Sequence, residues 1–253
     1  MKYRCWIMAI LAFSVVSVQS AEIGRASDTK KARKLCTQAT EALKSGRVEE
    51  GRGLFRKALE IAPDFPDAHV GLGQMAMAEQ RYKDAYAAFQ RAETAYIEYA
   101  NEVIRRAQQN ENAKMDEMAR LADASSQVAI SSSKSGAAPM AQAKLYNRAQ
   151  QLAISDGPLP TSVELTNPLG QIDYYAGNAL FRLGELAGAI DYFEASVKYS
   201  PLHLPSYVNL AIAYWKSGRS EDALSALARA EAQGLKVDPK LRADISAAPS
   251  AAQ

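Results

Sequence analysis

The chain has 253 residues, of which 48% are hydrophobic and 8% aromatic, a composition that is typical of folded proteins and argues against global disorder. The formal charge is +2, and setting aside Lys2 and Arg4 leaves 28 basic and 28 acidic residues. This balance argues against a general nucleic-acid binder, because such domains normally show a basic excess or a basic stripe.

The first twenty residues have the pattern of a secretory signal. A basic start is followed by a mostly apolar run over residues 5–18, and a small residue, Ser20, ends a suitable cleavage site. We expect cleavage before Ala21 and an exported protein, periplasmic in a bacterium or otherwise secreted. The alternative is a retained anchor, although an apolar run of 14 residues is shorter than the roughly 20 that a spanning helix needs.

Cleavage would leave Cys36 as the single cysteine of the mature chain. A lone thiol closes no internal disulfide, so we expect stability to come from helix packing. We interpret Cys36 as a small, apolar-like residue on a helix rather than as a reactive thiol.

Two similar units of about 34 residues occupy residues 31–99, after a polar segment over residues 21–30 that we expect to be disordered. In each unit, small and large apolar residues alternate on the faces of two helices. Only Gly or Ala fits where helices cross closely, and larger side chains fill the adjoining gaps. The pattern residues are Leu35, Ala39, Ala42, Gly51, Phe55 and Ala58 in the first unit, and Leu72, Gly73, Ala76, Tyr82, Ala85, Phe89 and Ala92 in the second.

Residues 100–169 interrupt this pattern. From Glu93 to Ile130 the chain lacks proline and glycine and is rich in helix-favouring residues, which predicts one long helix and leaves open a kink near Asn110. A loop over residues 131–139, a helix over residues 140–154 and an irregular, proline-rich connection over residues 155–168 follow. We favour a helical insertion. The alternative is a pair of degenerate repeats, with Tyr146 and Ala149 as packing residues of a diverged unit.

The pattern returns twice over residues 170–235, at an offset of 34 residues. The matched pairs are Ala176/Leu210, Gly177/Ala211, Leu180/Tyr214, Gly184/Gly218, Ala189/Ala223, Phe193/Leu227 and Ser196/Ala230. A fixed period of this size indicates a repeat architecture, in which each helical pair needs its neighbour to bury its apolar face. Residues 236–245 are expected to form a capping helix, and residues 246–253 a disordered tail.

The repeated pattern resembles the tetratricopeptide repeat, and the resemblance covers four repeats. It implies an all-α fold, a right-handed α-solenoid of antiparallel helix pairs, here with a long helical insertion. It also implies a non-enzymatic scaffold whose first helices line a concave groove for a protein or peptide partner. Two competing hypotheses are an oligomerising protein whose long helix pairs with another chain, and an accessory subunit of an envelope enzyme or assembly complex.

The resemblance places nine residues on that groove. They are Tyr174, Asn178, Phe181, Arg182, Val208, Asn209, Ile212, Trp215 and Lys216. The two asparagines are 31 residues apart, which is the separation of paired asparagines in family members that bind C-terminal carboxylates. The alternative is that the insertion's helices cover Phe181 and Trp215.

The chain also departs from the carboxylate-binding members of the family. Those members carry basic residues where this chain has Tyr174, Pro239 and Ala243, so we do not expect a carboxylate clamp. In addition, Asp173 stands where a large packing residue is usual. The sequence therefore indicates a groove without identifying its occupant, and it leaves the oligomeric state open.

Motifs for other chemistry are weak or missing. The two histidines, His69 and His203, are far apart in the sequence, and no HxxxH or CxxC pattern occurs, so we expect neither a metal nor a cofactor. Gly71-Leu72-Gly73 faintly resembles a dinucleotide-binding loop, but no strand precedes it and the repeat explains its glycine as a packing residue. No nucleophile, base and orienting group can be proposed together, so we do not expect an enzyme.

Overall fold

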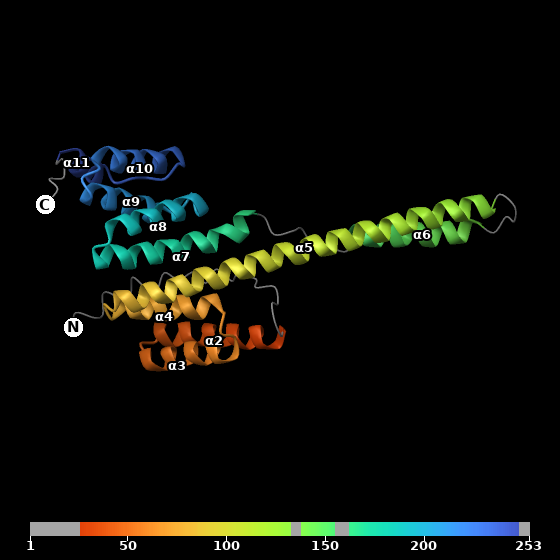
Figure 1. Ribbon diagram of the computed structural model, residues 1–253, viewed down its shortest axis with the longest axis horizontal. Helices are drawn as coiled ribbons and strands as arrows, with labels where there is room; N and C mark the ends of the chain where they lie inside the picture. The colour runs from red at the N-terminus through yellow and green to blue at the C-terminus, as the bar shows by residue number, and fades with distance from the viewer. Residues whose placement is uncertain (1–25, 133–137, 155–161, 248–253) are drawn as a thin grey trace. The chain divides into compact units, whose positions relative to one another are not determined.

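The computed structural model describes residues 26–132, 138–154 and 162–247, and every regular element in these ranges is a helix. The predicted signal segment, residues 1–20, lies outside the described residues. Short turns join the helices of each repeat into antiparallel pairs, which confirms the predicted all-α solenoid (Figure 1).

The chain divides into two compact units. Unit 1 comprises Met1–Tyr99 and Ser162–Gln253, and unit 2 comprises Ala100–Thr161. The helices are α2 (Ala26–Lys44), α3 (Val48–Ile61), α4 (Pro66–Ala78), α5 (Tyr82–Ser132), α6 (Ala138–Ile154), α7 (Ser162–Leu183), α8 (Leu186–Tyr199), α9 (Leu204–Lys216), α10 (Ser220–Ala232) and α11 (Pro239–Ala247).

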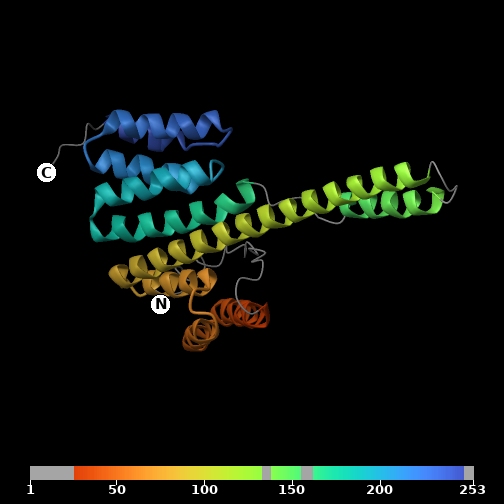
Figure 2. The same cartoon turned by 45° about the vertical axis from the view of Figure 1, so that its right-hand side comes forward.

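The described residues of unit 1 form four helical pairs: α2 with α3, α4 with the first part of α5, α7 with α8, and α9 with α10. Helix α11 packs on α10 at the end of the array. In unit 2, α6 lies alongside the later part of α5, as Figure 2 shows. An ion pair joins these two helices, with 3.9 Å between Arg148 Nε and Glu117 Oε1.

Helix pairing in unit 1 follows the predicted alternation of small and large residues. A Cβ atom built on Gly73 would lie 2.5 Å from the ring of Phe89, and one built on Gly177 would lie 2.7 Å from the ring of Phe193. Both rings are fully buried. Because glycine has no side chain, each ring packs directly on the backbone of the partner helix, at a separation that alanine would not allow.

The turns inside the repeats require left-handed backbone. Gly46, Gly184 and Gly218 occupy three of these turns with φ between +77° and +83°, where glycine is favoured because it lacks a Cβ atom. The second repeat has Gln80 at the corresponding position, with φ of 61°. A non-glycine residue in this region costs about 1–2 kcal/mol, so the surrounding structure must hold the turn in place.

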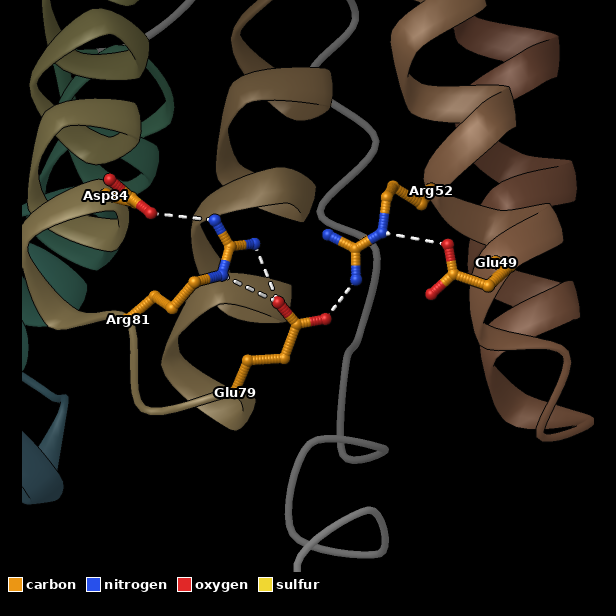
Figure 3. A network of polar contacts seen from close by, with 5 residues as sticks. All are labelled: Glu49, Arg52, Glu79, Arg81 and Asp84. Carbon is orange, nitrogen blue, oxygen red and sulfur yellow. Dashed lines mark hydrogen bonds and ion pairs between the residues drawn. The ribbon is translucent and has the colours of Figure 1, made fainter.

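A polar network includes Glu79 and Arg81, the residues on either side of Gln80 (Figure 3). Arg81 donates hydrogen bonds to Asp84 at 2.7 Å and to Glu79 at 2.6 Å. Arg52, from α3, donates to the other carboxylate oxygen of Glu79 and also contacts Glu49. Burial opposes ionisation of Glu79, but the hydrogen bonds from Arg81 and Arg52 lower its pKa below the usual value. The network ties the first repeat to the turn of the second.

The start of the array differs from the prediction. Residues 21–30 were expected to be disordered, whereas α2 already begins at Ala26. An acidic residue, Asp28, lies in the first turn of α2 and pairs with Lys31 at 3.7 Å. A carboxylate in the first turn stabilises a helix by complementing its dipole. This local stabilisation favours a start of α2 before its packed residues.

The proline-rich connection is also shorter than predicted. Helix α7 begins at Ser162, and Pro168 lies inside it, although residues 155–168 were expected to be irregular. Residues 155–161 lie outside the described residues. Ser200, which follows the last residue of α8, holds the early part of α7, because its hydroxyl shares one proton between Asn167 O at 3.0 Å and Asn167 Oδ1 at 2.6 Å. These tertiary contacts override the usual cost of proline in a helix.

Helices α5, α6 and α11 can be compared with the predictions for the remaining segments. Helix α5 passes through Asn110 as a single α-helix, and α11 runs to Ala247, two residues into the predicted tail, of which residues 248–253 lie outside the described residues. Tyr146 is 65% exposed on α6. It therefore does not act as the packing residue that a diverged repeat would place there.

Candidate peptide-binding groove on helices α7 and α9

Helices α7 and α9 carry the nine residues predicted to line a groove, and the two helices contact each other within unit 1. Arg182 and Lys216 are exposed at the ends of these helices. The other seven residues are half-buried: Tyr174, Asn178, Phe181, Val208, Asn209, Ile212 and Trp215. The structure thus brings the predicted set together, and its role in binding stays a prediction.

The sequence separates this face from the packing face. On α7, the residues Ala176, Gly177 and Leu180 are buried. Asn178 and Phe181 follow their own helical spacing of three and four residues, so they lie on another face of the same helix. The same division holds on α9, where Leu210 and its neighbours are buried and the groove residues are only partly covered.

The two predicted asparagines contact each other directly. Asn209 Nδ2 donates a hydrogen bond to Asn178 Oδ1 at 2.6 Å, joining α9 to α7. A primary amide has two N–H donors and an oxygen that can accept two hydrogen bonds. In the described part of the chain, Asn178 Nδ2 and Asn209 Oδ1 take no further part in hydrogen bonding. The pair therefore keeps N–H donors on both amides, and the oxygen of Asn209 as an acceptor, for a ligand.

Apolar and cationic groups lie on the same two helices. Lys216 Nζ lies 5.9 Å from the centre of the Phe181 ring, within the range of a cation–π contact. Trp215 packs against the core cluster with part of its surface exposed. Aromatic side chains that are half-covered in this way offer a large apolar area to a ligand at little conformational cost.

A chain of hydrogen bonds through two buried serine hydroxyls links α7, α8 and α9, and sequence reasoning missed it. His203 Nδ1 lies 2.6 Å from Ser206 Oγ, Ser206 Oγ lies 2.6 Å from Ser196 Oγ, and Ser196 Oγ donates to Gly170 O at 2.6 Å. Each hydroxyl has one proton to donate. Ser206 must therefore donate to Ser196 and accept from His203, which fixes the proton on Nδ1 of the imidazole.

His203 connects this chain to the groove, because its ring meets the ring of Tyr174 edge-on with 4.8 Å between the ring centres. Burial lowers the pKa of His203. One indication of this hydrogen-bond chain was present in the sequence: the third repeat has Ser196 where the fourth repeat has Ala230. A polar residue at a buried small-residue position needs a hydrogen-bond partner.

Asp173 is a buried acid at the junction of the second and third repeats. Only 1% of its surface is exposed, and Oδ2 has no hydrogen-bond partner in the described structure. Burial, with a further contribution from the nearby Glu93, raises the pKa of Asp173 to about 8. Burial also raises the pKa of Glu93, partly offset by a 3.2 Å hydrogen bond from the Tyr192 hydroxyl.

Tetratricopeptide-repeat models match residues 36–100 and 180–243, which together make up about half of the chain. The chain belongs to the tetratricopeptide-repeat family. Members of this family are typically protein-interaction scaffolds, and the four helical pairs of unit 1 give this tetratricopeptide-repeat protein the same architecture.

Solved structures of the same kind are similar to this tetratricopeptide-repeat protein. YrrB, described as a TPR protein with an unusual peptide-binding site, is 16% identical, with 88% of this chain and 95% of that chain covered and a TM-score of 0.30. PilF of Pseudomonas aeruginosa is 16% identical, with 87% and 89% covered and a TM-score of 0.34. No curated protein matches the chain significantly.

Metal-binding clusters and membrane-spanning helices are both absent from the described ranges. Residues 26–132, 138–154 and 162–247 contain no group of three or more His, Cys, Asp or Glu side chains placed to hold a metal ion. In those same ranges, no helix combines the length and the apolar character that crossing a bilayer requires.

Proposed function

We propose that this tetratricopeptide-repeat protein is an exported, non-enzymatic scaffold that binds an extended segment of a protein partner on the face of α7 and α9, within a cell-envelope or secreted complex. The observation that carries the proposal is the 2.6 Å hydrogen bond between Asn209 and Asn178, which brings two amides from neighbouring repeats together on that face. Phe181 and Trp215 lie on the same helices and are half-buried.

The chemistry of this face suits a peptide. An extended peptide carries N–H and C=O groups that must be satisfied when it is bound, whatever its side chains are. Asparagine amides donate and accept hydrogen bonds and can serve that backbone, while aromatic side chains select among the ligand's side chains. Nothing in this chemistry requires the scaffold to catalyse a reaction.

Replacing Trp215 tests the proposal. We expect Trp215→Ala to weaken partner binding by about 2 kcal/mol or more, because aromatic anchors dominate interface energetics. Leu202→Ala is the matched control, since Leu202 is an apolar residue outside the predicted set and is 70% exposed on the turn between α8 and α9. Affinity capture from the native envelope with each variant, followed by quantitative mass spectrometry, measures the difference.

A photoreactive residue replacing Lys216 shows whether the captured partner lies against the groove. The proposal is supported by a partner that Trp215→Ala fails to capture, that Leu202→Ala still captures, and that cross-links to the photoreactive residue at position 216. Circular dichroism must show that both variants keep their helices, because a lost fold would imitate a lost site. If the wild type, Trp215→Ala and Leu202→Ala are all folded and capture the partner equally, the proposal is contradicted.

Export is the second part of the proposal, and it rests on the basic start and the short apolar run of the first twenty residues. We expect protein isolated from its native host to begin at Ala21, as intact-mass measurement and N-terminal peptide sequencing would show. Fractionation of the cells should place it outside the cytoplasm. A membrane-embedded product that still begins at Met1 would favour the retained anchor instead.

A further inference from the structure

The contact of the second repeat with the third, here called the middle seam, joins the first part of α5 to α7 and α8. It differs in charge from the seams on either side. Arg52 pairs with Glu79 between the first and second repeats. Between the third and fourth repeats, Arg229 Nη1 lies 2.9 Å from Glu194 Oε1. Each outer seam therefore joins opposite charges, which attract each other around neutral pH.

Two carboxyl groups lie at the middle seam instead. Asp173, on α7, is 1% exposed, and its Oδ2 atom has no hydrogen-bond partner in the described structure. Glu93, on α5, is the nearby acid and accepts a 3.2 Å hydrogen bond from the Tyr192 hydroxyl of α8. Burial raises the pKa of both acids, and no cation in the described part of the chain lowers either pKa. The two carboxylates therefore repel each other when both are ionised.

The remaining titratable groups near this seam stay neutral around neutral pH or lie elsewhere. Burial raises the pKa of Tyr192, and it raises that of Tyr175 to about 12. His203, which precedes α9, contacts Tyr174 and does not contribute to the pKa of Asp173; nor does any charged group of α4. The titratable groups at the seam are thus Glu93 and Tyr86 on α5, Asp173 and Tyr175 on α7, and Tyr192 on α8.

Small side chains make up much of the apolar packing at the middle seam. Its core cluster places the ring of Phe89 among four alanines, Ala76, Ala85, Ala176 and Ala179. The cluster of the third and fourth repeats contains larger buried side chains, among them Leu180, Leu210 and Leu227. Because the free energy of burial grows with the apolar area removed from water, the middle seam separates more easily than the seam beyond it.

We propose that the middle seam is a proton-controlled hinge, closed while Asp173 holds its proton and opened when Asp173 and Glu93 are both charged. A buried carboxylate with an unpartnered oxygen is costly, and opening lets water hydrate it. In the closed form the pKa of Asp173 is about 8, against an ordinary value of 3.8, so the closed form binds more protons between these values. Its advantage is complete below pH 4 and is lost as the pH rises through 8.

Distances between spin labels across the seam test the hinge in the full chain with Cys5 and Cys36 replaced by alanine. Thr94→Cys and Lys198→Cys label exposed positions on α5 and α8, one on each side of the middle seam. Lys198→Cys with Ala232→Cys, also exposed, is the matched pair across the third and fourth repeats. We expect a longer-distance population for the first pair that grows by up to about tenfold per pH unit from pH 5 and levels off above pH 8, because one proton is released. The matched pair should keep its distances.

Three variants of the labelled protein identify the group that titrates. Asp173→Asn keeps the shape of the side chain but carries no titrating proton, so the distances across the middle seam should become independent of pH. Glu93→Gln removes the repulsion that helps to raise the pKa of Asp173, so the growth should level off below pH 8. Asp191→Asn, at an exposed position on α8, should respond as the parent protein does.

The remaining outcomes overturn the inference. Distances that do not change with pH in the parent protein show that the seam stays closed. An equal change in Asp173→Asn shows that another group controls it. Circular dichroism at each pH must show intact helices, because a longer distance that appears only as helicity is lost reports global unfolding and not a hinge.

Discussion

Truncating Phe89 to alanine is expected to lower the free energy of unfolding by about 3–5 kcal/mol, the usual cost of removing a fully buried phenylalanine. The ring is 0% exposed, packs over Gly73 and stacks on Tyr175 with 5.6 Å between ring centres. Its loss leaves a cavity where the second repeat meets the third. Urea denaturation followed by circular dichroism measures the change.

Tyr146→Ala provides the control for this experiment, because Tyr146 is an aromatic residue that is 65% exposed on α6. Exposed substitutions of this kind usually stay within about 0.5 kcal/mol of the wild type. A denaturation midpoint for Phe89→Ala that equals that of the wild type would show that the ring does not fill the repeat core.

Replacing Asp173 with asparagine is expected to stabilise the protein increasingly as the pH rises from 4 to 8. The folded-state pKa of about 8 lies above the ordinary value of 3.8, so the folded state binds more protons between these values. Stability from the protonated acid is therefore fully present below pH 4 and is lost as the pH rises through 8. Asparagine does not titrate and removes this loss.

One pKa unit corresponds to about 1.4 kcal/mol, so we expect Asp173→Asn to exceed the wild type by about 2 kcal/mol or more at pH 8 and to equal it near pH 4. The nearby charged group is Glu93, which accepts a hydrogen bond from the Tyr192 hydroxyl. Glu93→Gln should make the stability of the protein depend less on pH, since Glu93 contributes to the raised pKa of Asp173. Asp191→Asn, at an exposed position on α8, is the control. Parallel pH profiles for wild type and Asp173→Asn would contradict the burial argument.

The packing of the repeats was predictable because it follows a fixed spacing of small and large residues. Gly73 with Phe89, and Gly177 with Phe193, are local patterns in which each residue needs only the next helix to define its surroundings. The same spacing placed Asn178 on a separate face of α7. Such features depend on the helical repeat alone, which a sequence displays directly.

The features that sequence reasoning missed depend on contacts between distant parts of the chain. Pro168 reads as a helix breaker, and only the hydrogen bonds from Ser200 show why α7 continues through it. The direct bond between Asn178 and Asn209 depends on the distance between two helices, which spacing along the chain does not fix. Similarly, the role of His203 follows from two serines that belong to different helices.

The stacking of Phe89 on Tyr175 also bears on how the protein forms during its synthesis. These residues are 86 positions apart, whereas Phe55 and Gly71, which pack together between the first two repeats, are 16 apart. Closing the longer loop costs roughly 1.5 kcal/mol more in chain entropy, at about 0.6 kcal/mol for each doubling of length. At about 5–20 residues per second, the ribosome needs roughly 4–17 s to make the intervening chain. Until that chain has been made, the ring of Phe89 has no Tyr175 to stack on, so this contact between the second and third repeats can form only after most of the protein has been synthesised.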